Sequence, residues 1–213
     1  MFADRRDAGM QLAQQLAPYR GRQAVVLGVP RGGVIVAQEL AHALDGDMDV
    51  VLAHKLGSPS HPELAIGAVA ENGALFLNEE IIRSLDVDEK YIQQQRDRRM
   101  AEIRHRAELF RRYLPRVPLV GTIVIITDDG VATGATTQAA IRATRLERPD
   151  ILIGALPVGP EDTIIQLAQE TDEMICLRSP PLFTAVGQFY EHFEPVADED
   201  VLRVLQQEQL RRS

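Results

Sequence analysis

The chain has 213 residues, 45% of them hydrophobic, which suits one α/β domain with an added segment or two small domains. Its formal net charge of −8 excludes an overall basic field that would attract nucleic acid or an anionic membrane. The one cysteine, Cys176, excludes an internal disulfide. No apolar run approaches the roughly 18 residues of a membrane-spanning helix. The first residues lack the apolar segment of a signal peptide, so we expect a cytoplasmic protein.

The N-terminal part predicts a helix, a strand and a second helix. Asp4 can cap a helix over residues 4–17, which we interpret as a packing helix. The alternative is a cover over a binding site or a dimer contact. A core strand is predicted over residues 23–29, and a helix over residues 34–44.

The loop between this strand and helix contains Pro30, Arg31, Gly32 and Gly33. Its two glycines allow the backbone to approach a ligand closely, and Arg31 can present a fixed positive charge to an anion. An ordinary strand-to-helix turn with a solvated arginine explains the same pattern.

A second strand is predicted over residues 49–53, with His54 and Lys55 at its C-terminal end. Ligands of open α/β sheets bind beyond the carboxyl ends of the strands, so we expect Lys55 to meet a phosphate group. A surface lysine is the alternative. His54 has the chemistry of a general acid or base, although a histidine at a strand end more often makes a structural hydrogen bond.

Residues 57–118 are predicted to hold a hairpin followed by helices. A short strand over residues 65–69 is predicted to pair with residues 74–77 as a hairpin, and one or two helices follow over residues 79–114. From Arg96 to Arg112 there are seven arginines and three acids. We interpret this stretch as a solvated amphipathic helix. A nucleic-acid-binding arm and a closing arm that lends an arginine to an anion are the alternatives.

The central motif runs from Thr122 to Thr137 and reads TIVIITDDGVATGATT. An apolar, β-branched run predicts a buried parallel strand that ends at Asp128 and Asp129. A loop of small residues then leads into a helix over residues 135–147. Small residues at a helix N-terminus suit a phosphate, and two carboxylates can accept hydrogen bonds from a ribose diol or hold a metal through water. An ordinary turn with an aspartate cap is the alternative.

The remaining chain continues the alternation of strands and helices. Strands are predicted over residues 151–156 and 174–177, with a helix over residues 161–169 between them. This order predicts an α/β fold with a mostly parallel twisted sheet flanked by helices. The tail holds Phe189, Tyr190 and Phe193, whose rings can stack on a nucleobase or plug a core. A closing helix is predicted over residues 198–207.

The string IITDDGVATGATT resembles the phosphoribosyl-pyrophosphate (PRPP) loop of type I phosphoribosyltransferases. The resemblance implies that Asp128 and Asp129 hold the ribose hydroxyls and, indirectly, Mg²⁺. It also implies that the loop Pro30 to Gly33, with Lys55, binds pyrophosphate. Asp128, Asp129, Arg31 and Lys55 are the expected catalytic residues. The residues expected to bind the 5′-phosphate are Gly130, Val131, Ala132, Thr133, Gly134, Ala135, Thr136 and Thr137.

The same resemblance implies one phosphoribosyltransferase-like domain over residues 1–213. Residues 57–118 would be its flexible arm with a helical insertion, and residues 178–213 its small C-terminal hood. In the hood Phe189, Tyr190 and Phe193 are expected to bind the base. The chain also resembles a broad group of bacterial phosphoribosyltransferases with no defined acceptor.

The function implied is transfer of the phosphoribosyl group from PRPP–Mg to a purine or pyrimidine base, with release of pyrophosphate, in nucleotide metabolism. A homodimer is expected from the family, and no membrane or nucleic-acid partner is expected. Two other functions use the same phosphate cradle: a non-catalytic sensor of PRPP or a nucleotide that regulates RNA or DNA, and a hydrolase of a phosphorylated ribose compound. The sequence does not identify the acceptor base.

Overall fold

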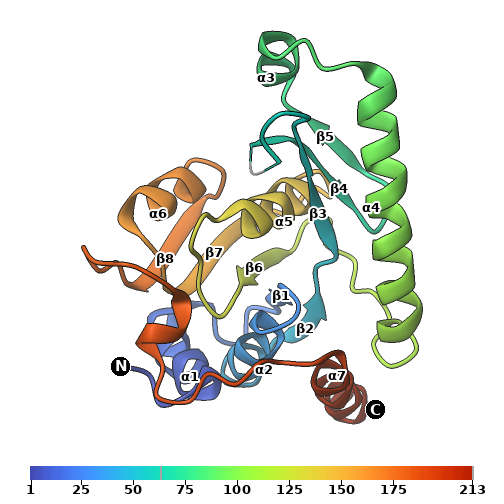
Figure 1. The fold of residues 1–213 in the computed structure, drawn as a ribbon. Helices are drawn as coiled ribbons and strands as arrows, with labels where there is room; N and C mark the ends of the chain where they lie inside the picture. The colour runs from blue at the N-terminus through green and yellow to red at the C-terminus, as the bar shows by residue number, and fades with distance from the viewer. Residues whose placement is uncertain (63, 213) are drawn as a thin grey trace.

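A computed structural model describes residues 1–62 and 64–212 of the chain (Figure 1). Five parallel strands form the main sheet in the order β2-β1-β6-β7-β8. Their bounds are β1 Val25–Gly28, β2 Asp47–Val50, β6 Ile123–Thr127, β7 Ile151–Val158 and β8 Glu173–Arg178. The predicted α/β fold with a parallel sheet flanked by helices is confirmed.

The main sheet is buried on both faces because its strands are apolar at successive positions. In β6, Ile123 and Ile125 belong to the core on one side, which includes residues of α1 (Arg5–Gln15) and α2 (Gly33–Ala43). Val124 and Ile126 belong to the core on the other side, which includes residues of α5 (Ala135–Arg145) and α6 (Glu161–Ala168). Alternate residues of a strand point to opposite faces, so this continuous run fills both cores.

A second sheet of three antiparallel strands, β3-β4-β5, forms the upper part of the molecule in Figure 1. Its strands are β3 Ala53–Gly57, β4 Ala65–Ala70 and β5 Leu75–Leu77. Two helices follow, α3 Glu79–Ser84 and α4 Glu89–Phe110. The predicted hairpin is therefore confirmed, and the one or two helices predicted over residues 79–114 are two, of which only α4 is long.

The predicted strand over residues 49–53, with Lys55 at its end, is wrong. The main-sheet strand ends at Val50, and Ala53 already begins β3 of the second sheet. The apolar stretch over residues 51–53 reads as part of one strand because hydrophobic periodicity does not show which sheet each residue joins. His54 and Lys55 therefore lie inside β3 of the second sheet.

An ion-pair network attaches the end of α4 to both sheets. The Arg111 guanidinium donates two hydrogen bonds to Glu71, of 2.8 and 2.6 Å, and also bonds the carboxylate of Asp49 in β2. The Asp49 side chain is only 2% exposed. Burial raises its pKa, while the nearby Arg111 charge opposes that shift.

The C-terminal segment returns across the main domain to the chain's beginning. Hydrogen bonds join Phe2 to the backbone of Phe189 and Glu191, and a short β-bridge joins Phe2 to Tyr190. The last helix, α7 Asp198–Arg212, packs against α2 and α4. Within the described residues, no helix has the length and apolar character needed to cross a membrane.

Candidate functional site

The candidate site lies where the order of the strands reverses direction. β1 and β6 are neighbours in the sheet, with Gly28 paired to Thr127 at their C-terminal ends. From β1 the chain crosses to β2 on one side, and from β6 it crosses to β7 on the other. The two loops that follow these strands therefore meet at a topological switch point, where α/β proteins bind their ligands.

The loop after β1 packs directly against the acid pair. A Cβ atom added to Gly32 would lie 1.9 Å from Oδ2 of Asp129, and one added to Gly33 would lie 2.7 Å from Cα of Asp128. Neither position has room for a side chain. The glycines are thus required by close packing between the two predicted ligand loops. Arg31 is exposed in this loop, and the peptide bond between Pro30 and Arg31 is cis.

The two aspartates have different surroundings. One oxygen of Asp128 accepts a hydrogen bond from the Asp129 N–H at 2.9 Å, and the other lies 3.4 Å from the Thr137 hydroxyl. Burial and the neighbouring charge of Asp129 raise the pKa of Asp128 well above its usual value. Oδ2 of Asp129 instead accepts a 2.7 Å hydrogen bond from Nε of Arg5. Asp128 is therefore a carboxyl group that resists ionisation, whereas the carboxylate of Asp129 is paired with the cation of Arg5.

The loop after the acid pair leads into α5 through two glycines with positive φ, Gly130 and Gly134. Val131 anchors the loop: its side chain is buried, and its N–H bonds the Val158 carbonyl at 2.9 Å. Because it already has this carbonyl as its partner, the Val131 N–H is not available to bind a phosphate. Thr133 and Thr136 are exposed, whereas Thr137 is buried beside Asp128.

Both helices at the switch point begin without a side-chain cap. Their N-cap residues are Gly32 for α2 and Gly134 for α5. By contrast, Asp4 caps α1 and Asp88 caps α4 through side-chain hydrogen bonds. In α2 the Val34 and Ile35 N–H groups already donate to the carbonyls of Arg31 and Gly32 at 3.2 Å each, so an anion there would meet the Gly32–Gly33 end of the helix. The first N–H groups of α5 have no partner within the helix and can donate to an anion.

β3 presents its two basic residues on opposite faces. Lys55 pairs with Ala68 of β4, and Ala68 shares a core with Ala139 of α5. Cross-strand partners point to the same face, which places Lys55 on the α5 side of the sheet. Lys55 thus belongs to a different strand from the one predicted, yet it lies on the side of the helix that begins at the phosphate loop.

His54 points to the α4 side, where a small cavity joins both ligand loops. The cavity has a volume of about 40 Å³, and its walls include Pro30, His54, Arg106 and Thr136. This volume suits a water molecule or one oxygen-bearing group of a larger anion. Burial lowers the pKa of His54, while Glu102 opposes that shift. Within the described part of the chain, Arg106 has no ion pair or side-chain hydrogen bond.

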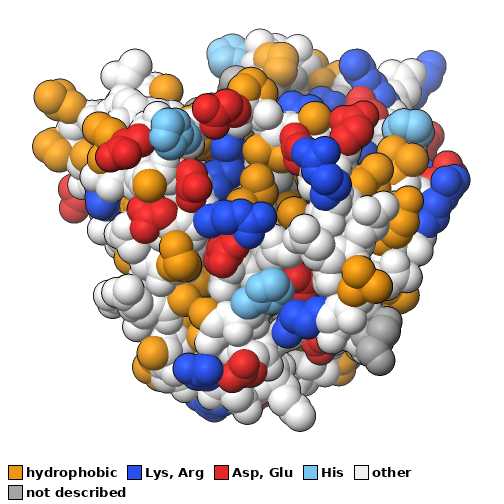
Figure 2. Space-filling view, turned by 90° about the horizontal axis from the view of Figure 1, so that it is seen from below, with side chains coloured by type: hydrophobic (Ala, Val, Ile, Leu, Met, Phe, Trp, Pro, Cys, Tyr) orange, Lys and Arg blue, Asp and Glu red, His pale blue; other side chains and the backbone are white. Residues whose placement is uncertain are grey.

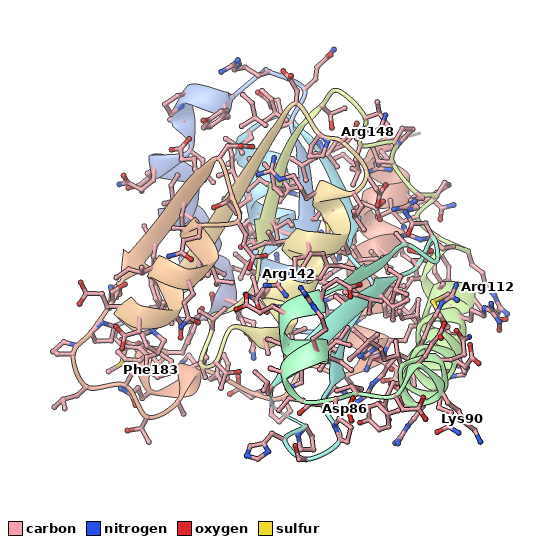
Figure 3. All side chains as sticks on the ribbon, turned by 90° about the horizontal axis from the view of Figure 1, so that it is seen from above. Asp86, Lys90, Arg112, Arg142, Arg148 and Phe183 are labelled. Atoms are coloured by element: carbon pink, nitrogen blue, oxygen red, sulfur yellow. The ribbon has the colours of Figure 1, made fainter. Side chains whose placement is uncertain are left out.

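The aromatic residues of the tail gather beside Asp129. Tyr190 is 6% exposed, and its hydroxyl donates to the Asp129 carbonyl. Its ring stacks on Phe193 with centroids 4.9 Å apart, and Phe189 stacks on Phe183 at 5.4 Å. In Figure 3 Phe183 lies on the side of the molecule opposite α4 and its residue Lys90. The tail and the arm therefore approach the site from opposite sides.

Two residues at the site, Arg5 and Arg106, were missed by sequence reasoning. Arg5 lies 124 residues before Asp129, in a helix that we interpreted as a packing element. Arg106 is one of seven arginines in its stretch, and no local pattern separates it from the others. The position of Arg106 one turn after the buried Ile103 was the available signal, because residues three and four apart share a helix face.

The acid pair is the candidate position for a divalent ion. Among residues 1–62 and 64–212, no three His, Cys, Asp or Glu side chains gather closely enough to hold a metal. Asp128 and Asp129 still provide adjacent carboxylate oxygens. Mg²⁺ usually keeps several waters and combines one or two carboxylates with substrate phosphates, so the pair fits an indirect role.

Comparison with known proteins identifies the family. The phosphoribosyl transferase domain model matches residues 4–164, and the chain therefore belongs to this family. The resemblance seen in the sequence and the transferase class that it implied are confirmed at the level of the family.

Two relatives show how far the similarity extends. A Mycobacterium tuberculosis (H37Rv) protein named "Putative phosphoribosyl transferase Rv0571c" is 45% identical over 205 residues, covering 96% of this chain and 46% of that protein. The chain thus spans about half the length of the curated relatives it matches. The crystal structure of TT1426 from Thermus thermophilus is 42% identical, with a TM-score of 0.91, and the match covers 97% of this chain and 98% of that one.

Proposed function

We propose that this chain binds PRPP with Mg²⁺ and transfers its phosphoribosyl group to a nucleobase-like acceptor, releasing pyrophosphate. The observation that carries the proposal is the contact between Gly32 and Asp129, which joins the two predicted ligand loops at the switch point. PRPP has a ribose diol between a 5′-phosphate and a pyrophosphate. Its three parts match the acid pair, the start of α5 and the start of α2.

In this proposal the acid pair orients the ribose and the two helix ends bind its charged groups. Asp128 and Asp129 accept hydrogen bonds from the ribose hydroxyls. N–H groups at the start of α5, with Thr133 and Thr136, bind the 5′-phosphate. Magnesium, held through water and PRPP oxygens, would supply additional positive charge to the pyrophosphate.

Departure of pyrophosphate leaves positive charge on the ribose and places negative charge on the leaving group. We infer that Arg31, Lys55 and the start of α2 stabilise the leaving group, because preorganised cations and N–H groups act where charge develops. Asp129, which keeps Arg5 as its partner, remains available to stabilise the ribose. We also propose that the acceptor is a nucleobase-like compound. The homodimer expected from the family is proposed for this chain as well.

Titration calorimetry with PRPP, with and without Mg²⁺, tests the binding step. Binding that depends on Mg²⁺ supports the proposal, and a panel of bases screened for pyrophosphate release then identifies the acceptor. A folded protein that does not bind PRPP contradicts it. A protein that regulates RNA or DNA would instead bind nucleic acid with an affinity that falls steeply as salt is added.

The charges on one face of the molecule bear on that alternative. The face formed by α1, α2 and α7, at the bottom of Figure 1, carries acidic and basic side chains intermixed (Figure 2).

Arg106 gives a prediction for the arm. We expect Arg106→Ala to raise the Kd for PRPP roughly 10-fold, because the substitution removes a cation from a cavity shared by both ligand loops. Arg104→Ala is the matched control, since Arg104 is an exposed arginine of the same helix. Calorimetry on the three proteins measures the change. Equal affinities for the Arg106→Ala and Arg104→Ala variants would remove Arg106 from the site.

A further inference from the structure

A column of rings, formed by Phe2, Tyr190 and Phe193, stands beside the acid pair and ends at Arg5. The centroids of Phe2 and Tyr190 are 5.2 Å apart, and those of Tyr190 and Phe193 are 4.9 Å apart. The Arg5 guanidinium lies over the Phe193 ring, with its Cζ atom 3.9 Å from the ring centre. Both Tyr190 and Phe193 therefore have two aromatic or cationic neighbours within the fold.

This ring column joins both ends of the chain. The Phe2 N–H donates to the Phe189 carbonyl at 2.7 Å, and the Glu191 N–H donates to the Phe2 carbonyl at 2.8 Å. The Tyr190 hydroxyl donates to the backbone carbonyl of Asp129. The tail is thus fastened to the first residues of the chain and to the backbone of the acid pair.

Arg5 makes the contact from this unit to the carboxylate itself. Its Nε lies 2.7 Å from Oδ2 of Asp129, and its Nη1 donates to the Glu194 carbonyl at 3.0 Å. The Arg5 side chain is 10% exposed and that of Asp129 16%. The guanidinium also packs near Gly32, since a Cβ atom there would lie 3.0 Å from Nε of Arg5. Arg5 consequently contacts both ligand loops and the tail at once.

We propose that Arg5 is a positioning residue, which holds the Asp129 carboxylate in the orientation that accepts a ribose hydroxyl and makes that orientation depend on the tail. The inference rests on the proposed function. The Arg5 hydrogen bond is made to Oδ2 of Asp129, so Oδ1 lies outside this ion pair. A planar guanidinium fixed by a ring and a carbonyl has few alternative positions, so the carboxylate is oriented before the ligand arrives.

In this view the ring column serves as a support. The faces of Tyr190 and Phe193 are covered by other rings and by Arg5. These two residues therefore pack within the fold in this proposal, and they do not stack on a base. The aromatic stack and the buried hydrogen bonds fix where the guanidinium lies, and the guanidinium fixes the carboxylate. A change in the tail, including one caused by an acceptor, would reach the ribose site through Arg5.

The surroundings of Arg5 offer a direct chemical test. A cavity of about 330 Å³ lies beside Arg5, with walls that include Ile35, Pro195, Val196 and Val204. Shortening the Arg5 side chain would connect this cavity to the space next to Asp129. A small cation in solution can then reach the vacated position, because the cavity is far larger than a guanidinium ion.

The experiment compares PRPP binding by the whole chain carrying Arg5→Ala, Arg5→Lys or Arg6→Ala. Arg6 is the matched control, since it is the next residue of α1 and its side chain pairs with Glu39. We expect Arg5→Ala to raise the Kd for PRPP roughly 10- to 100-fold. Added guanidinium, well below denaturing concentrations, should restore much of the affinity. Arg5→Lys should retain part of it, and Arg6→Ala should change little.

The outcomes separate the inference from the function on which it rests. A wild-type protein that does not bind PRPP removes both. Wild-type binding together with unchanged affinity in Arg5→Ala removes the role of Arg5 alone. A folded Arg5→Ala protein that loses affinity and is rescued neither by guanidinium nor by lysine would also overturn the proposal, because Arg5 would then matter to packing only.

Discussion

Replacing Asp128 or Asp129 with asparagine is expected to weaken PRPP binding greatly in both cases while shifting stability in opposite directions. Each substitution replaces a carboxyl group that is proposed to accept hydrogen bonds from the ribose hydroxyls, and a loss of about 100-fold in affinity is expected from the strength of such hydrogen bonds. Titration calorimetry in the presence of Mg²⁺ measures this loss.

The stability effects differ because the two carboxyls differ. The pKa of Asp128 is raised in the folded protein, so the native state binds more protons than the unfolded state between the two pKa values, and stability falls as pH rises through that window. Above the folded pKa the ionised carboxyl opposes folding. Asp128→Asn should therefore raise the free energy of unfolding relative to the wild type at high pH, and the gain should shrink as pH falls toward the unfolded pKa.

Asp129→Asn should do the reverse. The substitution leaves the buried guanidinium of Arg5 without its carboxylate, which is expected to cost about 1 to 3 kcal/mol. Urea unfolding at several pH values measures both variants. Asp150→Asn is the control, since Asp150 is an exposed aspartate outside the site. Two variants that lose stability alike, or that bind PRPP as the wild type does, would contradict the roles given to the pair.

Replacing Arg111 with methionine is expected to cause the largest loss of stability, about 3 to 5 kcal/mol. Arg111 has Asp49 and Glu71 as partners, with side chains 2% and 16% exposed, and methionine would leave both carboxylates without a cation. Protonation of Asp49 would then become more favourable, so the deficit should narrow at acidic pH.

Urea unfolding also measures the Arg111 prediction. Arg112→Met serves as control, because Arg112 is exposed and points outward from the same end of α4 (Figure 3). A deficit that is absent, or equal to that of Arg112→Met, would show that the network does not hold the arm to the sheet. If Arg111→Met shows the whole expected loss of stability while the folded protein binds PRPP with unchanged affinity, Arg111 anchors the arm and has no part in ligand binding.

The acid pair and both ligand loops could be predicted from sequence because their information is local. Four apolar residues, two acids and a run of small residues define strand, site and helix within one stretch. The same periodicity failed at residues 51–53, where the chain passes from one sheet to another. A hydrophobic run indicates that its residues are buried, but it does not indicate in which of the two sheets they are buried.

Arg5 could not be predicted for a different reason. Its partners are Asp129, Phe193 and Glu194, all more than a hundred residues away in the chain. No spacing rule relates an arginine in the first helix to a ring in the tail. The cluster of aromatic residues was visible in the sequence, but its partner Phe2 lies at the opposite end of the chain. Tertiary packing alone brings these groups together.

The contact between α5 and the second sheet consists largely of alanines. Ala139 and Ala143 of the helix meet Ala53, Ala68 and Ala70 of β3 and β4. Methyl groups have no rotamers, so this seam cannot absorb a displacement by rearranging side chains. Any tilt of the three-stranded sheet is passed to the helix as a rigid movement. The helix that begins at the phosphate loop and the sheet that carries Lys55 therefore behave as a single mechanical part.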